Sequence, residues 1–474
     1  MAGTPNSPPR VAIIGSGPAG FYAAEHLLKR EEATVEVDMF DRLPTPFGLV
    51  RGGVAPDHPK IKSVIRVYEK TAARDGYRFF GNVHLGRDLS PAELAERYHA
   101  VIYAYGAETD RHLGIPGEEL PGSGPATAFV GWYNGHPDYA GEQFDLSCER
   151  AVVIGNGNVA TDVTRMLALT REELVSTDTA DHAIEPLAES KIREIVVLGR
   201  RGPAQASFTN PELRELGEMS DADIHVDPAE LELDELSRRF LESDADITAR
   251  KNIEILTAFA AKQPEGKRKG IVLRFLTSPV EIQGDGRVER VVVGRNELHR
   301  DDSGAIRPRD SGERETIEAG LVLRSIGYKG IPLEGIPFDE RRGVIPNEGG
   351  RVIDPEGGGH LAGQYAVGWI KRGPTGVIGT NKKDAQETVE RLFEDLEGGR
   401  LPEPPRPEPA AIESLLREKV PDHVTYRGWE AIDRAEVERG KPQGRPRVKF
   451  CSIDEMVEVA SGEADPREVA AQRR

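Results

Sequence analysis

The chain has 474 residues, of which 38% are apolar, and a formal net charge of −18. Its length allows two or three domains, and its acidic balance disfavours a nonspecific nucleic-acid binder, which would be basic. No apolar run is long enough for a membrane span, and the first ten residues contain no apolar leader. We therefore expect a cytoplasmic protein without a cleaved signal peptide.

The two cysteines, Cys148 and Cys451, are far apart in the sequence. No CxxC or CxxxxC pair is present, so the chain cannot pass electrons through a close cysteine pair as disulfide reductases do. Two cysteines are also too few for a four-cysteine iron–sulfur cluster. We predict no metal site, and we interpret both cysteines as ordinary small residues.

The first part of the chain alternates apolar strands with amphipathic helices, a pattern typical of a parallel, doubly wound sheet. In chain order we predict a strand at 11–15, a helix to about residue 30, a strand at 35–41, a Gly/Pro-rich loop at 42–59, a helix that includes 61–68, and a strand at 100–106.

The same pattern restarts at residue 151 and ends with a strand that resembles the end of the first unit. We predict a strand at 151–155 followed by a helix, a strand at 194–199, a β-rich stretch at 271–295, a strand at 321–327, a strand, glycine loop and helix at 364–393, a Pro-rich linker at 401–410, and a mostly helical tail.

The first strand-to-helix junction, Gly15-Ser16-Gly17-Pro18-Ala19-Gly20, fits the GxGxxG fingerprint. Gly15 permits the tight turn, Gly17 lets the backbone approach a pyrophosphate, and Gly20 lets the helix pack on the strand. The helix N-terminus supplies N–H donors to the phosphates. Asp41 ends the next strand, where a carboxylate would accept hydrogen bonds from an adenosine ribose. These features predict a dinucleotide site; the alternative is a glycine turn needed only for packing.

The second junction, Gly155-Asn156-Gly157-Asn158-Val159-Ala160, fits GxGxxA. At the end of the next strand, Arg200 and Arg201 stand where the first unit has Asp41. A guanidinium pair can bind a 2′-phosphate, which a carboxylate would repel, so this site should prefer NADP(H). The alternative is a solvated arginine pair in a loop. One bound FAD and one diffusing NADPH, with a hydride passing between them, explain both sites.

The longer motifs resemble one family. GSGPAG, LPTPFGLVRGGVAPDHPKIK, VIGNGNVA, VLGRRGP and VGWIKRGPTGVIGTNKKDA are similar to the adrenodoxin reductase-type ferredoxin–NADP⁺ reductases, in particular the bacterial NADPH–ferredoxin reductases. The resemblance covers about residues 10–393. It implies an α/β fold with two Rossmann-like nucleotide-binding domains, the NADP domain inserted into the FAD domain. The expected parts are FAD domain 1–107, NADP domain 108–328, FAD domain 329–400, and linker and tail 401–474.

The resemblance also implies cofactor contacts at matching positions. Those expected to contact FAD are Ala19, Asp41, Leu49, Val83, Trp369 and the backbone of Gly376, Val377 and Ile378. Those expected to bind NADP(H) are Arg111, Asn156, Gly157, Asn158, Val159, Arg200, Arg201 and Glu212, with Gly376 near the nicotinamide.

Three residues form the expected catalytic set: His58, Asp162 and Glu212. The first two match positions in the catalytic neighbourhood of the family. Each also has an ordinary explanation. His58 precedes a helix and could cap it, and acidic residues such as Asp162 and Glu212 are favourable near helix N-termini in any protein.

The resemblance implies a flavoprotein that passes a hydride from NADPH to FAD and then single electrons to a ferredoxin or a similar acidic iron–sulfur protein. Such a partner needs a basic docking surface; the candidates are Lys60, Lys62, Arg66, Lys70, Arg51, Lys371 and Arg372. An ordinary solvated helix face is the alternative explanation of these cations. Because the net charge is −18, any electrostatic steering must be local.

Other functions remain open at this stage. The chain could be an NADPH-dependent flavin electron-transfer subunit or diaphorase that serves another acceptor. It could also be a non-enzymatic protein that senses NADPH. The sequence leaves open the electron acceptor, the direction of electron flow and the oligomeric state.

Overall fold

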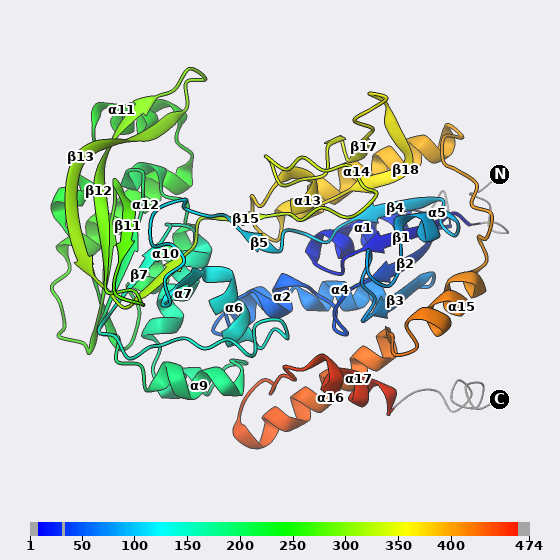
Figure 1. The fold of residues 1–474 in the computed structure, drawn as a ribbon, viewed down its shortest axis with the longest axis horizontal. Coiled ribbons are helices and arrows are strands. Elements are labelled where there is room, and N and C mark those ends of the chain that lie inside the picture. Colours follow the sequence, from blue (N-terminus) through cyan, green and yellow to red (C-terminus); the bar gives the residue numbers. More distant parts are fainter. Residues whose placement is uncertain (1–7, 31–33, 463–474) are drawn as a thin grey trace. The chain divides into compact units, whose positions relative to one another are not determined.

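The structure, a computed structural model, describes residues 8–30 and 34–462 (Figure 1). The first unit contains residues up to 54, residues 58–110 and residues from 327 on, whereas the second contains 55–57 and 111–326. The second unit is therefore inserted into the first. The two connecting segments, β5 (Thr109–Asp110) and β15 (Tyr328–Lys329), pair with each other as antiparallel strands. The expected domain limits were 107/108 and 328/329, a few residues from these changeovers.

Within the described residues, the first unit is built on an eight-stranded sheet with the order β16-β17-β18-β4-β1-β2-β3-β19. Its centre, β18-β4-β1-β2-β3, is parallel, whereas the outer pairs are antiparallel. The strands are β1 (Arg10–Ile14), β2 (Glu36–Phe40), β3 (Tyr77–Gly81), β4 (Ala100–Tyr103), β16 (Asn347–Glu348), β17 (Arg351–Ile353), β18 (His360–Ala366) and β19 (Val424–Thr425).

Helices cover both faces of this sheet, because alternate residues of each strand point to opposite sides. Val11 and Ile13 pack with α1 and α14, whereas Ala12 and Ile14 pack with α5 and α15. The helices are α1 (Pro18–Leu28), α2 (Leu49–Gly52), α3 (Pro59–Lys62), α4 (Ile65–Ala72), α5 (Pro91–Ala95), α13 (Trp369–Arg372), α14 (Thr380–Glu397), α15 (Pro409–Lys419), α16 (Tyr426–Gly440) and α17 (Ile453–Ser461). The single helix expected at 61–68 is thus divided into α3 and α4.

The described part of the second unit has a six-stranded sheet in which every neighbouring pair is parallel, with the order β6-β14-β7-β8-β10-β9. β14 lies beside β7 as β4 lies beside β1, which confirms the predicted likeness between 321–327 and the end of the first unit. The strands are β6 (Ser123–Pro125), β7 (Arg150–Ile154), β8 (Glu194–Leu198), β9 (Ala222–Val226), β10 (Lys269–Arg274) and β14 (Leu321–Arg324).

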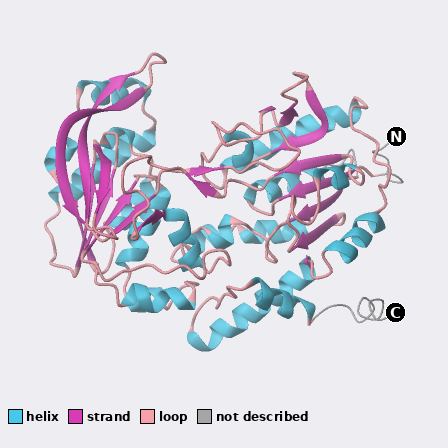
Figure 2. Cartoon of the chain, in the orientation of Figure 1, coloured by secondary structure: helices cyan, strands magenta, loops and turns pink. Residues whose placement is uncertain are grey.

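One face of the second sheet is covered by helices and the other by a three-stranded antiparallel sheet (Figure 2). Val152 and Ile154 of β7 share a core with Val291, Val293 and Ile317 of that small sheet. Its strands are β11 (Thr277–Gln283), β12 (Arg290–Arg300) and β13 (Ile306–Glu318). The helices of this unit are α6 (Ala126–Asn134), α7 (Asn158–Ala168), α8 (Arg171–Leu174), α9 (Asp181–Ala188), α10 (Asn210–Leu216), α11 (Glu235–Arg239) and α12 (Ile247–Ala261).

The C-terminal segment belongs to the first unit, although we expected linker and tail 401–474 as a separate part. β19 adds a strand beside β3, and Trp429, Ile432 and Phe450 are buried in the core that holds β1. The segment is mostly helical, as predicted. Its apolar residues face the first sheet, so they complete a core rather than form one. Residues 463–474 lie outside the described residues.

Candidate functional site

The glycines of the first loop have the backbone geometry that the fingerprint requires. Gly15 has φ +106°, and a Cβ there would lie 2.6 Å from the carbonyl oxygen of Ala104. A Cβ on Gly20 would lie 2.2 Å from the carbonyl oxygen of Gly15. At Gly17, by contrast, no atom of the described residues other than its two chain neighbours lies within 4 Å of the position of a Cβ. The loop is therefore closed on its protein side and open at the residue expected to face a pyrophosphate.

Asp41 is oriented by the same loop. Its Oδ2 accepts hydrogen bonds from the backbone N–H of Ser16 (2.9 Å) and from the Ser16 hydroxyl (2.5 Å), and its Oδ1 accepts from the N–H of Leu43 (2.9 Å). A carboxylate has about four acceptor positions, so it can still accept a ribose hydroxyl. Ser16 stands at a variable position of the fingerprint, and sequence analysis assigned it no role.

The loop around Leu49 contacts the glycine loop. The N–H of Phe47 donates to the carbonyl of Ser16 (3.0 Å), and a Cβ on Gly48 would lie 2.9 Å from the Cα of Gly17. Phe47 has φ +84°, a strained backbone for an aromatic residue that is often found at binding sites. Leu49 is 40% exposed. The expected FAD contact is thus a partly exposed apolar side chain on a loop held against the fingerprint.

Val83 is a different kind of expected FAD contact. It is buried, and its N–H donates to the carbonyl of Asp41 (2.9 Å). Asn82, which precedes it, has φ +59° and donates through its side-chain amide to Asp422 (3.1 Å). The turn after β3 is therefore attached both to the predicted ribose-binding residue and to the C-terminal segment.

The late FAD-domain segment reaches the same loop through Gly368. A Cβ there would lie 2.5 Å from the Cβ of Ala19, which brings the start of α13 against α1. Trp369 follows, and its ring lies 5.2 Å from that of Tyr328. Gly376 has φ +83° and no room for a side chain, because Thr380 lies 2.6 Å from the Cβ position.

Val377 and Ile378 lie just before Gly379, the N-cap residue of α14, as expected of a backbone at the mouth of a helix. Val377 is 56% exposed, and its N–H donates to the hydroxyl of Thr380 (3.1 Å). Thr380 therefore shapes both Gly376 and Val377, a role that sequence analysis did not assign to it.

The second loop repeats the geometry of the first. Gly155 has φ +129°, and a Cβ there would lie 2.1 Å from the carbonyl oxygen of Ser325, whereas Gly157 is open on its outer side. The side chain of Asn158 accepts from the N–H of Thr209 (2.8 Å), and the carbonyl of Asn156 accepts from the N–H of Ser207 (3.0 Å). Segment 207–209, which precedes α10, therefore holds this loop. Val159 packs partly buried against the core beneath it.

Arg200 and Arg201 come after β8 and Gly199, and this segment lies beside the second loop. A Cβ on Gly199 would lie 2.6 Å from the amide nitrogen of Asn156. Neither guanidinium has an ion-pair or hydrogen-bond partner among the described residues. Burial lowers the pKa of Arg201, and the positive charges of Arg200 and Arg307 lower it further. Two cations so close together, without a carboxylate, form a site suited to a multiply charged anion.

The expected catalytic residues of the second unit share one buried arginine, Arg165 of α7. It donates to Asp57 (2.9 Å), to Asp162 (2.8 Å) and to Glu212 (2.9 Å). Burial raises the pKa of Glu212, and the charges of Glu215 and Asp57 add to this, against the opposing charge of Arg165. Arg165 lies in α7 after the glycine motif, so no sequence motif points to it.

His58 and Arg111 lie in quite different surroundings. His58 is buried in the first unit and directly follows Asp57, which Arg165 binds. It is the N-cap residue of α3, the position that the ordinary explanation assigned to it, although its side chain makes no capping hydrogen bond. Arg111, the first residue of the main part of the second unit, is exposed.

Three of the expected docking cations are already paired inside the first unit. Arg51 binds the buried Glu436 (2.8 Å), Lys371 is buried and binds Glu387 (2.7 Å), and Arg372 binds Asp384 (3.0 Å). Their inclusion in a docking surface was wrong, because the three side chains are at most 18% exposed. Of the other four candidates, which lie in α3 and α4, Lys60, Arg66 and Lys70 are exposed and Lys62 is half-buried.

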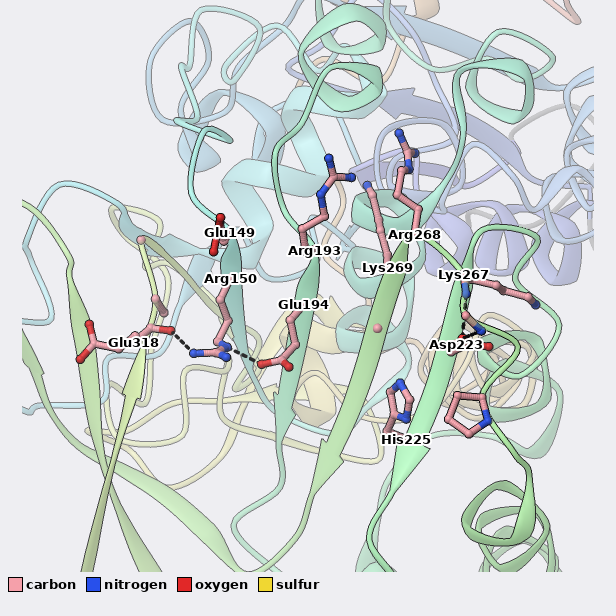
Figure 3. A pocket seen from close by; sticks show the side chains of 15 residues that line it. Glu149, Arg150, Arg193, Glu194, Asp223, His225, Lys267, Arg268, Lys269 and Glu318 are labelled. Atoms are coloured by element: carbon pink, nitrogen blue, oxygen red, sulfur yellow. Dashed lines mark hydrogen bonds and ion pairs between the residues drawn. The ribbon is translucent and has the colours of Figure 1, made fainter.

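A pocket of about 590 Å³ lies elsewhere on the second unit, at the ends where β7, β8 and β10 begin (Figure 3). Its walls are ion pairs and loop anchors: Arg150 bonds to Glu194 and to the backbone of Glu318, and Asp223 accepts from the N–H of Lys267 (2.9 Å). Ligands of open α/β sheets bind outside the carboxyl ends of the strands. This pocket is at the opposite edge and is not the nucleotide site.

Fold and site together define a class: an oxidoreductase with two dinucleotide-binding units, one inserted into the other. The family model for pyridine nucleotide-disulphide oxidoreductases matches residues 9–197. Cys148 and Cys451 belong to different units, so neither unit has a cysteine pair.

Curated relatives are more specific. NADPH-ferredoxin reductase FprA of Mycobacterium leprae is 52% identical over 95% of this chain and 98% of its own length. Human mitochondrial NADPH:adrenodoxin oxidoreductase is 43% identical over 96% of this chain and 93% of its own length. The structure of Mycobacterium tuberculosis FprA in complex with NADPH has a TM-score of 0.89 and 50% identity, and covers 96% of this chain and 100% of that chain. The chain belongs to the NADPH-ferredoxin reductase family, which confirms the predicted fold class.

Among the described helices, none is long and apolar enough to cross a membrane.

Proposed function

We propose that the protein takes a hydride from NADPH onto bound FAD and passes single electrons to a ferredoxin-type iron–sulfur protein. The observation that carries this proposal is the opposite charge of two otherwise similar loops. Asp41 lies beside the first loop, and Arg200 with Arg201 lies beside the second. Relatives named NADPH-ferredoxin reductase and NADPH:adrenodoxin oxidoreductase support it.

The first unit would hold FAD. The open side of Gly17 and the N-terminus of α1 suit a pyrophosphate, and Asp41 suits the adenosine ribose. When bound, FAD supplies a ring that accepts a hydride and releases its electrons singly. Trp369 and residues 376–378 would contact the cofactor from the late part of the chain.

The second unit would hold NADPH. Gly157 leaves room for the pyrophosphate at the N-terminus of α7, and the arginine pair would bind the 2′-phosphate. Asp162 and Glu212 stay proposed catalytic residues, together with His58. Arg165 orients the two carboxylates, because it binds both.

The partner would dock on α3 and α4. Lys60, Arg66 and Lys70 are exposed there, and Ile61 and Val67 are each 39% exposed. Cations interspersed with apolar side chains suit an acidic protein that must bind briefly and leave. A diaphorase that serves another acceptor remains the alternative, and a cytoplasmic location stays a prediction.

Purified protein tests this proposal. It should be yellow, lose its yellow colour on anaerobic addition of NADPH, and reduce cytochrome c only when a ferredoxin is added. A colourless protein with no flavin would overturn the proposal. A yellow protein that NADPH bleaches, but that reduces no ferredoxin, would support the diaphorase alternative.

A further inference from the structure

The backbone that carries the arginine pair is held by residues from outside its own loop. The carbonyl of Gly199 accepts from the N–H of Thr277 (3.0 Å), that of Arg201 from the N–H of Leu276 (3.0 Å), and that of Arg200 from the side-chain amide of Asn296 (2.8 Å). Three consecutive carbonyls are therefore fixed by β11, β12 and the turn that precedes them.

Asn296 is the only side chain among these three donors. It is 5% exposed and lies in β12, where the pairing with β13 shifts register. Its amide nitrogen donates to Arg200 and also to the hydroxyl of Ser278 (2.7 Å), which uses both N–H groups. Its backbone N–H donates to the carbonyl of Leu276 (2.7 Å). The side chain is thus held in one orientation.

Leu276 adds a strained link between Asn296 and the arginines. Its φ is +49°, a left-handed backbone that branched apolar residues rarely adopt. Its N–H bonds to Arg201 and its carbonyl to Asn296. Strain of this kind persists only where the surroundings enforce it, and it collects at binding sites.

The same small sheet contributes positive charge. Arg307 of β13 pairs in register with His299 of β12. Its guanidinium is held by Asp301 (2.9 Å), and its charge is felt at Arg201, where it lowers the pKa behind the larger effects of burial and Arg200. The β11–β13 sheet therefore supplies both the support for the arginine backbone and part of the local field.

We infer that Asn296 is a positioning residue for recognition of the 2′-phosphate, and that the β11–β13 sheet thereby sets the preference for NADPH over NADH. This inference rests on the proposed function, which assigns the arginine pair to that phosphate. A planar guanidinium binds phosphate through two parallel hydrogen bonds, so small displacements of its backbone weaken binding.

The test compares Asn296→Ala with a matched control, Ser278→Ala. The control disturbs the same buried amide but leaves its bond to Arg200. Asn296→Ala should raise KM for NADPH about fivefold, the effect of losing one neutral hydrogen bond, and leave kcat and KM for NADH within about twofold. Binding of adenosine 2′,5′-bisphosphate, measured by calorimetry, should weaken by the same factor, whereas binding of 5′-AMP should not change. Ser278→Ala should leave the ratio of KM for NADPH to KM for NADH as it is in the native protein.

The result that overturns the inference is an equal effect of Asn296→Ala on both cofactors, or an NADPH-specific loss in Ser278→Ala as large as in Asn296→Ala. Arg200→Ala/Arg201→Ala, assayed in parallel, separates this failure from that of the proposed function. If the arginine variant also fails to distinguish NADPH from NADH, the phosphate assignment itself is wrong.

Should Asn296→Ala not fold, Asn296→Gln replaces it, because it keeps the amide donors and displaces them by one methylene. We expect this variant to raise KM for NADPH about twofold to threefold with KM for NADH unchanged. Equal changes for both cofactors in this variant would overturn the inference as well.

Discussion

The two glycine loops have nearly the same backbone but different support. In each, the first glycine has a positive φ and its Cβ position meets a carbonyl, while the second glycine is open. The first loop is held by Asp41, Phe47 and the start of α13, all within a unit that the C-terminal segment completes. The second is held by segment 207–209, and its arginines by an added antiparallel sheet.

This difference shows that the fingerprint itself specifies a dinucleotide and not which one. Under the proposed function, the choice is made at the end of the next strand, by Asp41 in one unit and Arg200 with Arg201 in the other. Each choice then needs its own scaffold, because a carboxylate and a guanidinium pair must be held at different distances from the ribose.

The largest expected effect tests how far the support of the first loop extends. Glu436 is fully buried and binds Arg51 (2.8 Å), Arg447 (3.1 Å) and the N–H of Phe450 (2.9 Å). Glu436→Ala should destabilise the first unit by about 3–5 kcal/mol, because it leaves the half-buried Arg51 without a carboxylate and the N–H of Phe450 without an acceptor, whereas Arg447 keeps Asp433. Urea unfolding followed by flavin fluorescence would measure the loss. Glu438→Ala, on the exposed side of α16, is the control, and an equal loss there would contradict the prediction.

The next effect tests the charge of the second loop. Arg200→Ala/Arg201→Ala should raise KM for NADPH on the order of 100-fold, since two charge-assisted contacts are lost, and change KM for NADH little. Steady-state kinetics with both cofactors measures this. Arg238→Ala/Arg239→Ala on α11 removes the same charge from exposed positions, 58% and 66% accessible, and should leave both constants near the native values.

The corresponding substitution beside the first loop should have a smaller effect, on the binding of FAD. Asp41→Asn removes a charged acceptor for the ribose but keeps an oxygen for Ser16, so FAD should bind about tenfold more weakly. The fraction of flavin retained on gel filtration and a fluorescence titration of the apoprotein report this. Binding of adenosine 2′,5′-bisphosphate should stay as in the native protein. A comparable loss there would show that the two loops are not independent.

The last effect depends on pH. Asp395 of α14 accepts from Arg351 (2.8 Å), Tyr365 (2.7 Å) and Arg400 (2.7 Å). Burial alone would raise its pKa, but these hydrogen bonds lower it from the ordinary 3.8 to about 2.

The unfolded chain binds this proton near pH 3.8, and the folded chain only near pH 2. The carboxylate therefore stabilises the first unit above pH 3.8, and this contribution is lost as the pH falls to 2. Asp395→Asn should be less stable than the native protein at pH 6, and the difference should vanish near pH 2. Circular dichroism during acid titration measures it, with the exposed Glu390→Gln as control. A difference that persists at the acid end would contradict the assigned cause.

The local pattern of apolar and polar residues was sufficient to predict much of the fold. Strands β1, β2, β7 and β8 were predicted within one residue at each end, because buried parallel strands are continuous apolar runs bounded by glycines. The strands predicted at 100–106 and 321–327 extend three residues beyond β4 and β14, and β3 was not predicted. β13 was not predicted, since ten of its thirteen residues are exposed and its sequence shows no apolar alternation. The packing of the C-terminal segment was also missed, because its apolar residues find their partners far away in the chain.

The residues of the candidate site fall into the same two groups: those whose role follows from the local sequence and those whose role depends on tertiary contacts. The glycine roles at 15, 20 and 155 follow from contiguous residues and have the predicted geometry. Ser16, Arg165 and Asn296 were missed because their roles come from contacts with Asp41, with three acidic residues and with Arg200. Arg51, Lys371 and Arg372 were assigned wrongly, since a sequence does not show which cations the fold leaves exposed.

By itself, the sequence determined that there are two glycine loops of the dinucleotide type, with a carboxylate after the strand that follows the first and two arginines after the strand that follows the second. Short motifs can do this because a turn, a helix N-terminus and the end of the next strand are placed by residues close together in the chain. Tertiary structure alone decided what supports each loop and which charges remain available. Those properties depend on hydrogen bonds and ion pairs between distant segments, such as Asn296 with Arg200 and Glu436 with Arg51.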